Sequence, residues 1–138
     1  MANRWFNQFQ KTLEKEVVSI FARVTFGASG APTLVTSVSK GVVSVTRNSA
    51  GKYTFVFGTQ TGLLDVYPNL LMVKHVFDES GNGGTAPASP GMYILANNVA
   101  VSGTSSLQIE FNSAGTATDP ASGEAVFLQF MFKNSTAP

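Results

Sequence analysis

Residues 41–57 decide the fold class of this chain. Two runs rich in Val, Thr, Tyr and Phe flank the short segment Asn48-Ser49-Ala50-Gly51. Side chains that alternate with a period of two are typical of a half-buried antiparallel pair of strands. Asn and Gly tolerate the tight backbone of a turn. The segment therefore predicts a β-hairpin, in which Val43 and Val45 share one face of the first strand. Along the second strand, Tyr53, Phe55 and Phe57 alternate with Thr54 and Val56.

The rest of the chain after residue 16 repeats this pattern. Short alternating runs are separated by segments rich in Gly, Pro, Asn and Ser, which punctuate regular structure. The further predicted strands are residues 17–26, 34–38, 70–77, 92–101, 107–112 and 125–133. Such a series is typical of an all-β fold. We therefore expect an antiparallel β-sandwich or jelly-roll-like barrel of about seven to eight strands.

Three details of this pattern give sharper expectations. Pro32 lies in the loop 27–33, where its missing N–H is expected to interrupt strand pairing. The segment Asn48–Gly51 recurs as Asn112–Gly115, so we expect one turn conformation to be used twice. In the strand 70–77, strict alternation places Leu71 on the same face as Val73, His75 and Phe77.

Residues 1–16 differ from the rest and predict a separate N-terminal arm or short helix. The domain division is therefore an arm at 1–16 and a β-sandwich domain at 17–138. An apolar side chain recurs every fourth position, as on one face of an amphipathic helix. A helix of this length is marginal alone in water, so its apolar side must dock either on its own domain or on a neighbouring subunit. The residues predicted to form this interface are Trp5, Phe6, Phe9 and Leu13.

Composition narrows the range of functions. Hydrophobic residues make up 43% of the chain and charged residues 12%, with a formal net charge of +1. A typical soluble domain carries roughly twice that share of charged residues, about 25%. A neutral, hydrogen-bonding surface favours packing against other protein, and the alternative is a monomer of low charge. No basic stripe is present for phosphate contacts, and no apolar run is long enough to span a bilayer, so neither nucleic acid nor a membrane is an expected partner.

Few residues suggest catalysis or metal binding. His75 is the single histidine and the chain has no cysteine, so we expect a structural histidine and no cofactor. Asp78 and Glu79 at the mouth of the Gly-rich segment 78–91 could bind Ca²⁺, although a solvated turn is the simpler interpretation. No nucleophile elbow or phosphate-binding loop is present. The chain is therefore not expected to be an enzyme.

Several turn-and-strand segments in this order resemble a known class of proteins. They are residues 13–18 (LEKEVV), 27–34 (GASGAPTL), 39–45 (SKGVVSV), 47–54 (RNSAGKYT) and 118–124 (TDPASGE). The order resembles that of small virion structural proteins of tailed bacteriophages, of the capsid decoration (cement) kind. The resemblance extends over nearly the whole chain.

The resemblance implies a protein of the capsid surface, assembled in the host cytoplasm. It would bind the exterior of an expanded head as a homo-oligomer, a trimer or a dimer, and would clamp neighbouring major capsid protein subunits. The alternative is a head-fibre, tail or adsorption component whose 78–91 loop binds a glycan on the host surface. A third, remote alternative is a glycan-active enzyme that uses two carboxylates in one cleft.

Overall fold

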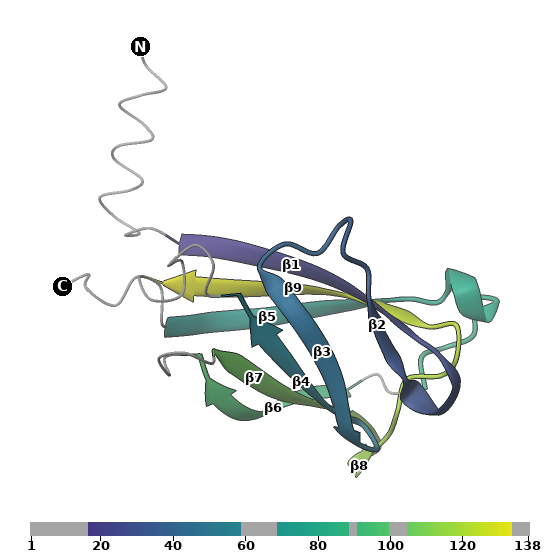
Figure 1. Ribbon diagram of the computed structural model, residues 1–138. Coiled ribbons are helices and arrows are strands. Elements are labelled where there is room, and N and C mark those ends of the chain that lie inside the picture. The colour runs from purple at the N-terminus through teal and green to yellow at the C-terminus, as the bar shows by residue number, and fades with distance from the viewer. Residues whose placement is uncertain (1–16, 59–68, 89–90, 100–104, 134–138) are drawn as a thin grey trace, which may run out of the picture.

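The computed structural model describes residues 17–58, 69–88, 91–99 and 105–133, which form two antiparallel β-sheets packed face to face (Figure 1). The first sheet has the order β2 (Pro32–Leu34), β1 (Val17–Phe26), β9 (Ala125–Lys133) and β5 (Asn69–Asp78). The second has the order β3 (Val42–Ser49), β4 (Lys52–Phe57), β7 (Ser106–Ser113) and β6 (Gly91–Asn98), with β8 (Thr116–Ala117) paired to β7. The predicted all-β antiparallel sandwich is confirmed.

Aromatic side chains from both sheets fill the core. The alternation predicted for the last two long strands is confirmed by the side chains that are buried: Leu107, Ile109 and Phe111 of β7, and Val126, Leu128, Phe130 and Phe132 of β9. Phe130 of β9 packs between Phe57 and Phe55 of β4, at ring-centroid distances of 5.0 and 5.6 Å. The contact with Phe57 is edge-on, which suits the charge distribution of aromatic rings, and the contact with Phe55 is tilted.

The predicted hairpin at 41–57 is confirmed, but the prediction that Val43 and Val45 share one face of its first strand is wrong. A register irregularity between Val42 and Ser44 inserts one residue against β4. Val42 is consequently buried, Val43 is exposed, and Val45 packs against the core. A bulge reverses the alternation at the point where it occurs, and nothing in a run of valines reveals one.

The same correction applies to β5. A register irregularity between Leu70 and Met72 places Leu70 on the core side together with Val73 and Phe77. Leu71, expected on that face, is 50% exposed.

The predicted strand at 34–38 is also wrong, because pairing with β1 begins at Pro32 and ends at Leu34. Pro32 is accommodated because β2 is an edge strand and the proline is its first residue. Residues 35–38 instead form a turn, in which the N–H of Ser39 donates to the carbonyl of Val35.

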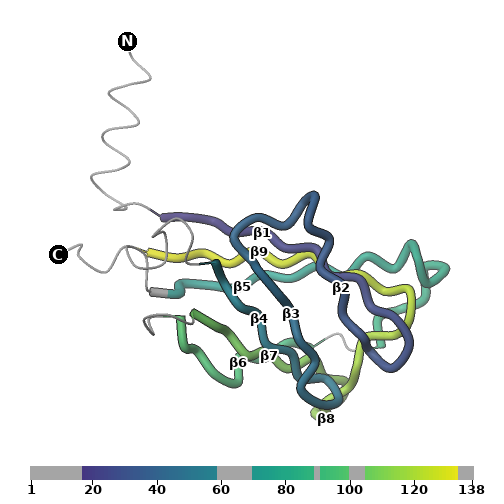
Figure 2. The backbone as a smooth tube through the Cα atoms, viewed as in Figure 1, coloured from purple at the N-terminus to yellow at the C-terminus, as the bar shows by residue number. Residues whose placement is uncertain are grey.

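Connections gather at one end of the sandwich, as the tube in Figure 2 shows. The 3-10 turns Ala28–Gly30 and Ser80–Asn82 lie there with the segment before β9. The N–H of Phe26 donates to the carbonyl of Glu124, and the N–H of Gly123 donates to that of Phe26. Loops far apart in sequence are thus held as one unit.

The repeated tetrapeptide forms two hairpin turns with different backbones. At the β7–β8 turn, Ala114 and Gly115 have φ values of 50° and 84°, as in the tight turns that match strand twist. At the β3–β4 turn only Gly51 has positive φ, at 70°, and a bulge precedes it. The expectation of one turn conformation is therefore wrong. The difference follows from packing, because the Gly51 turn rests on β7 and the Gly115 turn is open.

We predict that Gly51→Ala lowers the free energy of unfolding by about 2–3 kcal/mol. A Cβ at Gly51 would lie 2.5 Å from the carbonyl oxygen of Phe111 and 2.6 Å from the backbone nitrogen of Thr118, and neither can swing away. Gly115→Ala is the matched control, with similar φ and nothing within 4 Å. It should cost only the left-handed backbone strain, about 1 kcal/mol. Urea denaturation measures both, and equal losses would contradict the packing explanation.

Candidate interaction surface

The predicted interface residues Trp5, Phe6, Phe9 and Leu13 lie outside the described residues, so the structure leaves that prediction open. Within the described ranges, no helix is long and apolar enough to cross a membrane. The same ranges contain no group of three or more His, Cys, Asp or Glu arranged for a metal ion.

An apolar surface that the sequence analysis missed covers the outer face of the four-stranded sheet. Strand register places Arg23, Phe127 and Val76 in one row across β1, β9 and β5. Phe21, Gln129 and Lys74 form the next row, and Ser19, Met131 and Met72 the one after it. Exposed fractions are 53% for Phe21, 66% for Val76 and 43% for Phe127. We call these three rows, with Val38 beside them, the outer apolar face.

The sequence itself indicates that the outer side of this sheet is partly apolar. In β1, β5 and β9 the positions expected to face water include phenylalanine and valine as well as polar residues. Strands that are apolar on both sides are typical of sheets covered on both faces. The described residues leave this second face uncovered. Exposed apolar side chains gathered in this way make the face a candidate interaction surface.

A groove of about 260 Å³ lies in the outer apolar face. The residues that line it include Phe21, Val38, Val76 and Phe127, together with Lys74 and Gln129. Its volume is below the ~300–1,000 Å³ of pockets that enclose small molecules. A groove of this size fits side chains inserted from another polypeptide.

Arg23 fixes one end of the groove. Its guanidinium carbon lies 5.0 Å from the ring centroid of Phe127, in a cation–π contact, and Nη2 lies 3.2 Å from Oδ2 of Asp78. Ser80 and Arg23 hold the pKa of Asp78 below its usual value, so the pair stays ionised. Phe127 is thereby kept in place as one wall of the groove.

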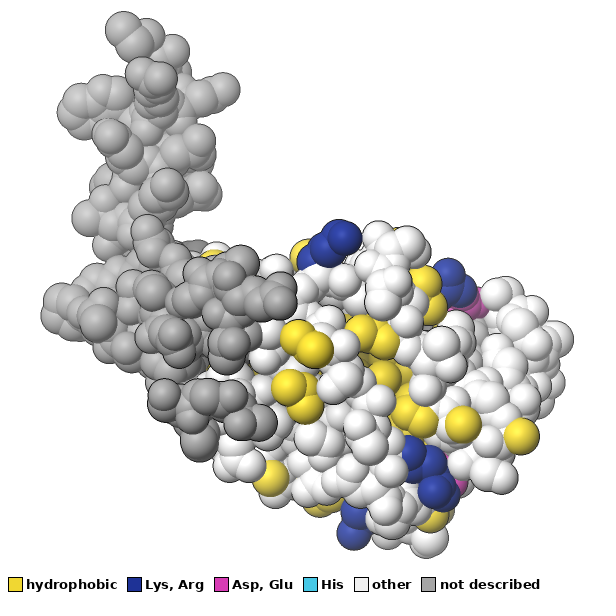
Figure 3. Space-filling view, in the orientation of Figure 1, with side chains coloured by type: hydrophobic (Ala, Val, Ile, Leu, Met, Phe, Trp, Pro, Cys, Tyr) yellow, Lys and Arg dark blue, Asp and Glu magenta, His cyan; other side chains and the backbone are white. Residues whose placement is uncertain are grey.

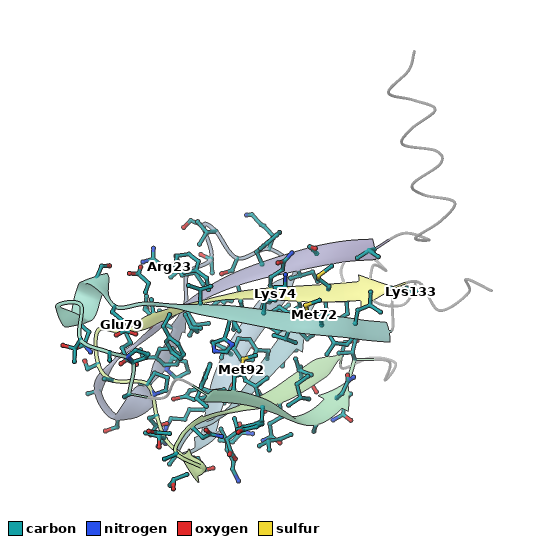
Figure 4. The ribbon with its side chains drawn as sticks, turned by 180° about the vertical axis from the view of Figure 1, so that it is seen from behind. Arg23, Met72, Lys74, Glu79, Met92 and Lys133 are labelled. Carbon is teal, nitrogen blue, oxygen red and sulfur yellow. The ribbon has the colours of Figure 1, made fainter. Side chains whose placement is uncertain are left out.

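Charge on this face is sparse, as it is elsewhere on the surface. Figure 4 shows Arg23 and Lys74 on the outer side of the four-stranded sheet, with Met92 between the two sheets. Asp78 neutralises Arg23, whereas Lys74 has no ion pair among the described residues. The view over β2 and β3 in Figure 3 likewise shows hydrophobic groups in a mostly uncharged surface, with a few Lys and Arg side chains around them. Such a surface suits contact with protein.

A cluster of polar side chains at the β3–β4 turn stabilises the folded structure. Asp119 accepts hydrogen bonds from Nε and Nη2 of Arg47, at 2.9 and 2.7 Å, and from the backbone N–H of Gly51 at 2.8 Å. The hydroxyl of Tyr53, whose side chain is buried, lies 2.9 Å from both Asp119 Oδ1 and the carbonyl oxygen of Gly30. Hydrogen bonding from Arg47 lowers the pKa of Asp119, and burial beside Asp119 raises that of Tyr53.

Glu124 joins the loop after β5 to the segment before β9, and the carboxyl group of Glu79 lies near it. Glu124 is fully buried and accepts hydrogen bonds from the N–H groups of Ala88 and Ala121, at 2.9 and 2.8 Å. Both carboxyl oxygens of Glu79 are shielded from solvent and have no hydrogen-bond partner among the described residues. Burial and the neighbouring Glu124 raise the pKa of Glu79. This pair is not in the groove, none of whose lining residues is acidic.

We predict that Glu79→Gln stabilises the protein at neutral pH and leaves its stability unchanged below pH 4. The folded state holds the Glu79 proton above the ordinary pKa of 4.5, at which the unfolded chain releases it. The wild type therefore loses stability as pH rises from about 4.5 through the folded-state pKa. The neighbouring Asp78→Asn is the control of opposite sign, because the pKa of Asp78 is lowered. Thermal unfolding from pH 3.5 to 7.5 measures both, and parallel curves for Glu79→Gln and the wild type would contradict this assignment.

Of the other residues considered from the sequence, His75 is also among the residues that line the groove. His75 is half-buried, and its ring packs edge-on against Phe77 at 5.6 Å. Asp78 accepts hydrogen bonds from the backbone N–H and the hydroxyl of Ser80, which closes the start of the loop. Of the 78–91 segment, residues 78–88 and 91 are described, and Glu124 ties them to the sandwich through Ala88.

No known protein family, curated protein or solved structure matches this chain.

Proposed function

We propose that this protein is a non-enzymatic phage virion protein that binds the outside of the capsid and stabilises contacts between major capsid protein subunits. The observation that carries the proposal is the outer apolar face, which combines a groove with five exposed apolar side chains, those of Phe21, Val38, Met72, Val76 and Phe127. Beside these side chains lie the Arg23–Asp78 ion pair and two further lysines, Lys74 and Lys40, the second of which is placed on this side by its bridge to Phe21. A face of this kind is adapted to contact with another protein subunit.

The low charge of the chain and the resemblance of its turn segments to decoration proteins support the same role. The arm residues Trp5, Phe6, Phe9 and Leu13 are proposed to dock on a neighbouring subunit. Burying each side chain contributes roughly 1.5–3 kcal/mol at most. Contacts of this size, repeated over every copy on a shell, would make the expanded head more resistant to bursting under internal pressure.

The test is binding of the purified protein to empty expanded heads, followed by co-sedimentation. The proposal expects saturable binding to expanded heads, on the order of hundreds of copies per head. Unexpanded heads and isolated tails are the controls. Binding to tails or to host cells, with none to heads, would refute the proposal and favour the alternative of an adsorption component that binds a host glycan.

A further inference from the structure

We propose that the groove in the outer apolar face receives the N-terminal arm, residues 5–13, of a second copy of this chain. The inference rests on the proposed docking role of the arm and adds the surface that receives it. Three observations carry it: the chemistry of the groove, the length of the arm, and the place where the arm joins the sheet.

The groove and the arm have matching chemistry. The groove is walled by Phe21, Val76 and Phe127. The arm offers Trp5, Phe9 and Leu13 at four-residue spacing, which a helix places along one stripe. Apolar side chains at this spacing that enter an apolar groove are a recurrent mode of helix recognition.

The apolar stripe of the arm and the outer apolar face also have similar lengths. A helix rises 1.5 Å per residue, so the stripe from Trp5 to Leu13 is about 12 Å long. The outer apolar face extends along β9 from Phe127 to Met131, and four strand residues cover about 13 Å. One helix laid along β9 would therefore contact all three rows of the face.

The point at which the arm joins β1 favours docking in the groove of a neighbouring copy over docking in the groove of the same chain. The arm joins β1 at Val17, and Phe21 lies about 13 Å further along the same strand. To reach its own groove, the chain would have to reverse direction between Leu13 and Val17. Residues 14–16 are Glu-Lys-Glu, which are good helix formers and contain none of the usual turn residues. Without a turn in these residues, the apolar stripe would lie beyond the start of β1 and not over its own sheet.

The experiment uses disulfide trapping. The chain has no cysteine, so no native thiol competes with the introduced ones. Thr12→Cys labels the arm beside its apolar stripe. Val76→Cys and Met72→Cys label the two ends of the outer apolar face on β5. Val43→Cys is the matched control, since Val43 is 61% exposed on the other sheet and Val76 is 66% exposed.

Arm-labelled copies are mixed with size-tagged, face-labelled copies under mild oxidation. We expect disulfides between different copies for Val76→Cys or Met72→Cys and none for Val43→Cys. A chain that carries both Thr12→Cys and Val76→Cys tests whether the arm docks in the groove of its own chain. Disulfides formed only within single chains, or none with either face label, would overturn the inference.

A second readout is self-association of the full chain, measured by light scattering over a concentration series. Val76→Lys should weaken association at least about tenfold, because it places a charge where apolar contact is expected, and Val43→Lys should leave it unchanged. Equal effects of the two substitutions would overturn the inference.

Arm deletion separates this inference from the proposed function. If the deletion abolishes head binding while the disulfide trapping fails, the proposed function stands, and the arm docks on capsid protein instead. If arm deletion leaves head binding intact, the docking role of the arm in the proposed function fails as well.

Discussion

Deletion of residues 2–13 is expected to lower the affinity for expanded heads at least a hundredfold, on the order of 3 kcal/mol. The deletion removes Trp5, Phe6, Phe9 and Leu13, and the loss of two well-buried side chains of this size is enough for that change. The same loss is expected whether the arm contacts capsid protein directly or links copies that bind together, because linked copies gain affinity by avidity. Co-sedimentation over a protein concentration series measures it.

The control for this deletion is the stability of the sandwich itself. The described core is formed by residues between Ile20 and Phe132, so its thermal unfolding midpoint should change little. A quadruple substitution of Trp5, Phe6, Phe9 and Leu13 by Ser keeps the length and charge of the arm and should reproduce the deletion. Unchanged head binding by both variants would refute the docking role of the arm.

Asp119→Ala is expected to lower the free energy of unfolding by about 3 kcal/mol. The substitution removes the acceptor for both Arg47 hydrogen bonds and for the Gly51 N–H, and it removes one partner of the Tyr53 hydroxyl. Glu110→Ala is a matched control, because the Glu110 side chain is similarly buried but has one ion-pair contact, to Lys52 at 3.8 Å. Its cost should stay below about 1 kcal/mol. Urea denaturation at pH 7 separates the two, and equal losses would contradict the role of the network.

The same network predicts a pH dependence of defined sign. Arg47 lowers the pKa of Asp119 below its ordinary value of 3.8. The stabilisation by the carboxylate is therefore complete above about pH 4 and is lost as pH falls through the folded-state pKa. The difference in stability between the wild type and Asp119→Asn should shrink below pH 4. A difference that stays constant down to pH 2 would show that the carboxylate charge is not responsible.

Sequence patterns predicted the architecture well where alternation is uninterrupted. β7 and β9 bury the expected residues, since a period of two determines which side chains face the core. The facing of Val43 and Leu71 could not be predicted, because each lies at a bulge that depends on the partner strand. The pairing of Arg47 with Asp119 was equally inaccessible, since 72 positions separate them and only the packed turns bring them together.

The outer apolar face could have been predicted in part. Phe21, Val76 and Phe127 occupy the positions of their strands that alternation assigns to water, which marks those strands as apolar on both sides. Their convergence in one groove depends on the register of β1, β9 and β5, and that register is visible only in the folded sheet.

A density map of an intact virion tests the proposed function as a whole. The account predicts this β-sandwich on the exterior of the expanded head, in copy numbers on the order of hundreds, with the arm of each copy against a neighbouring subunit. Density for the sandwich confined to the tail or to a fibre, in a few copies per particle, would contradict it.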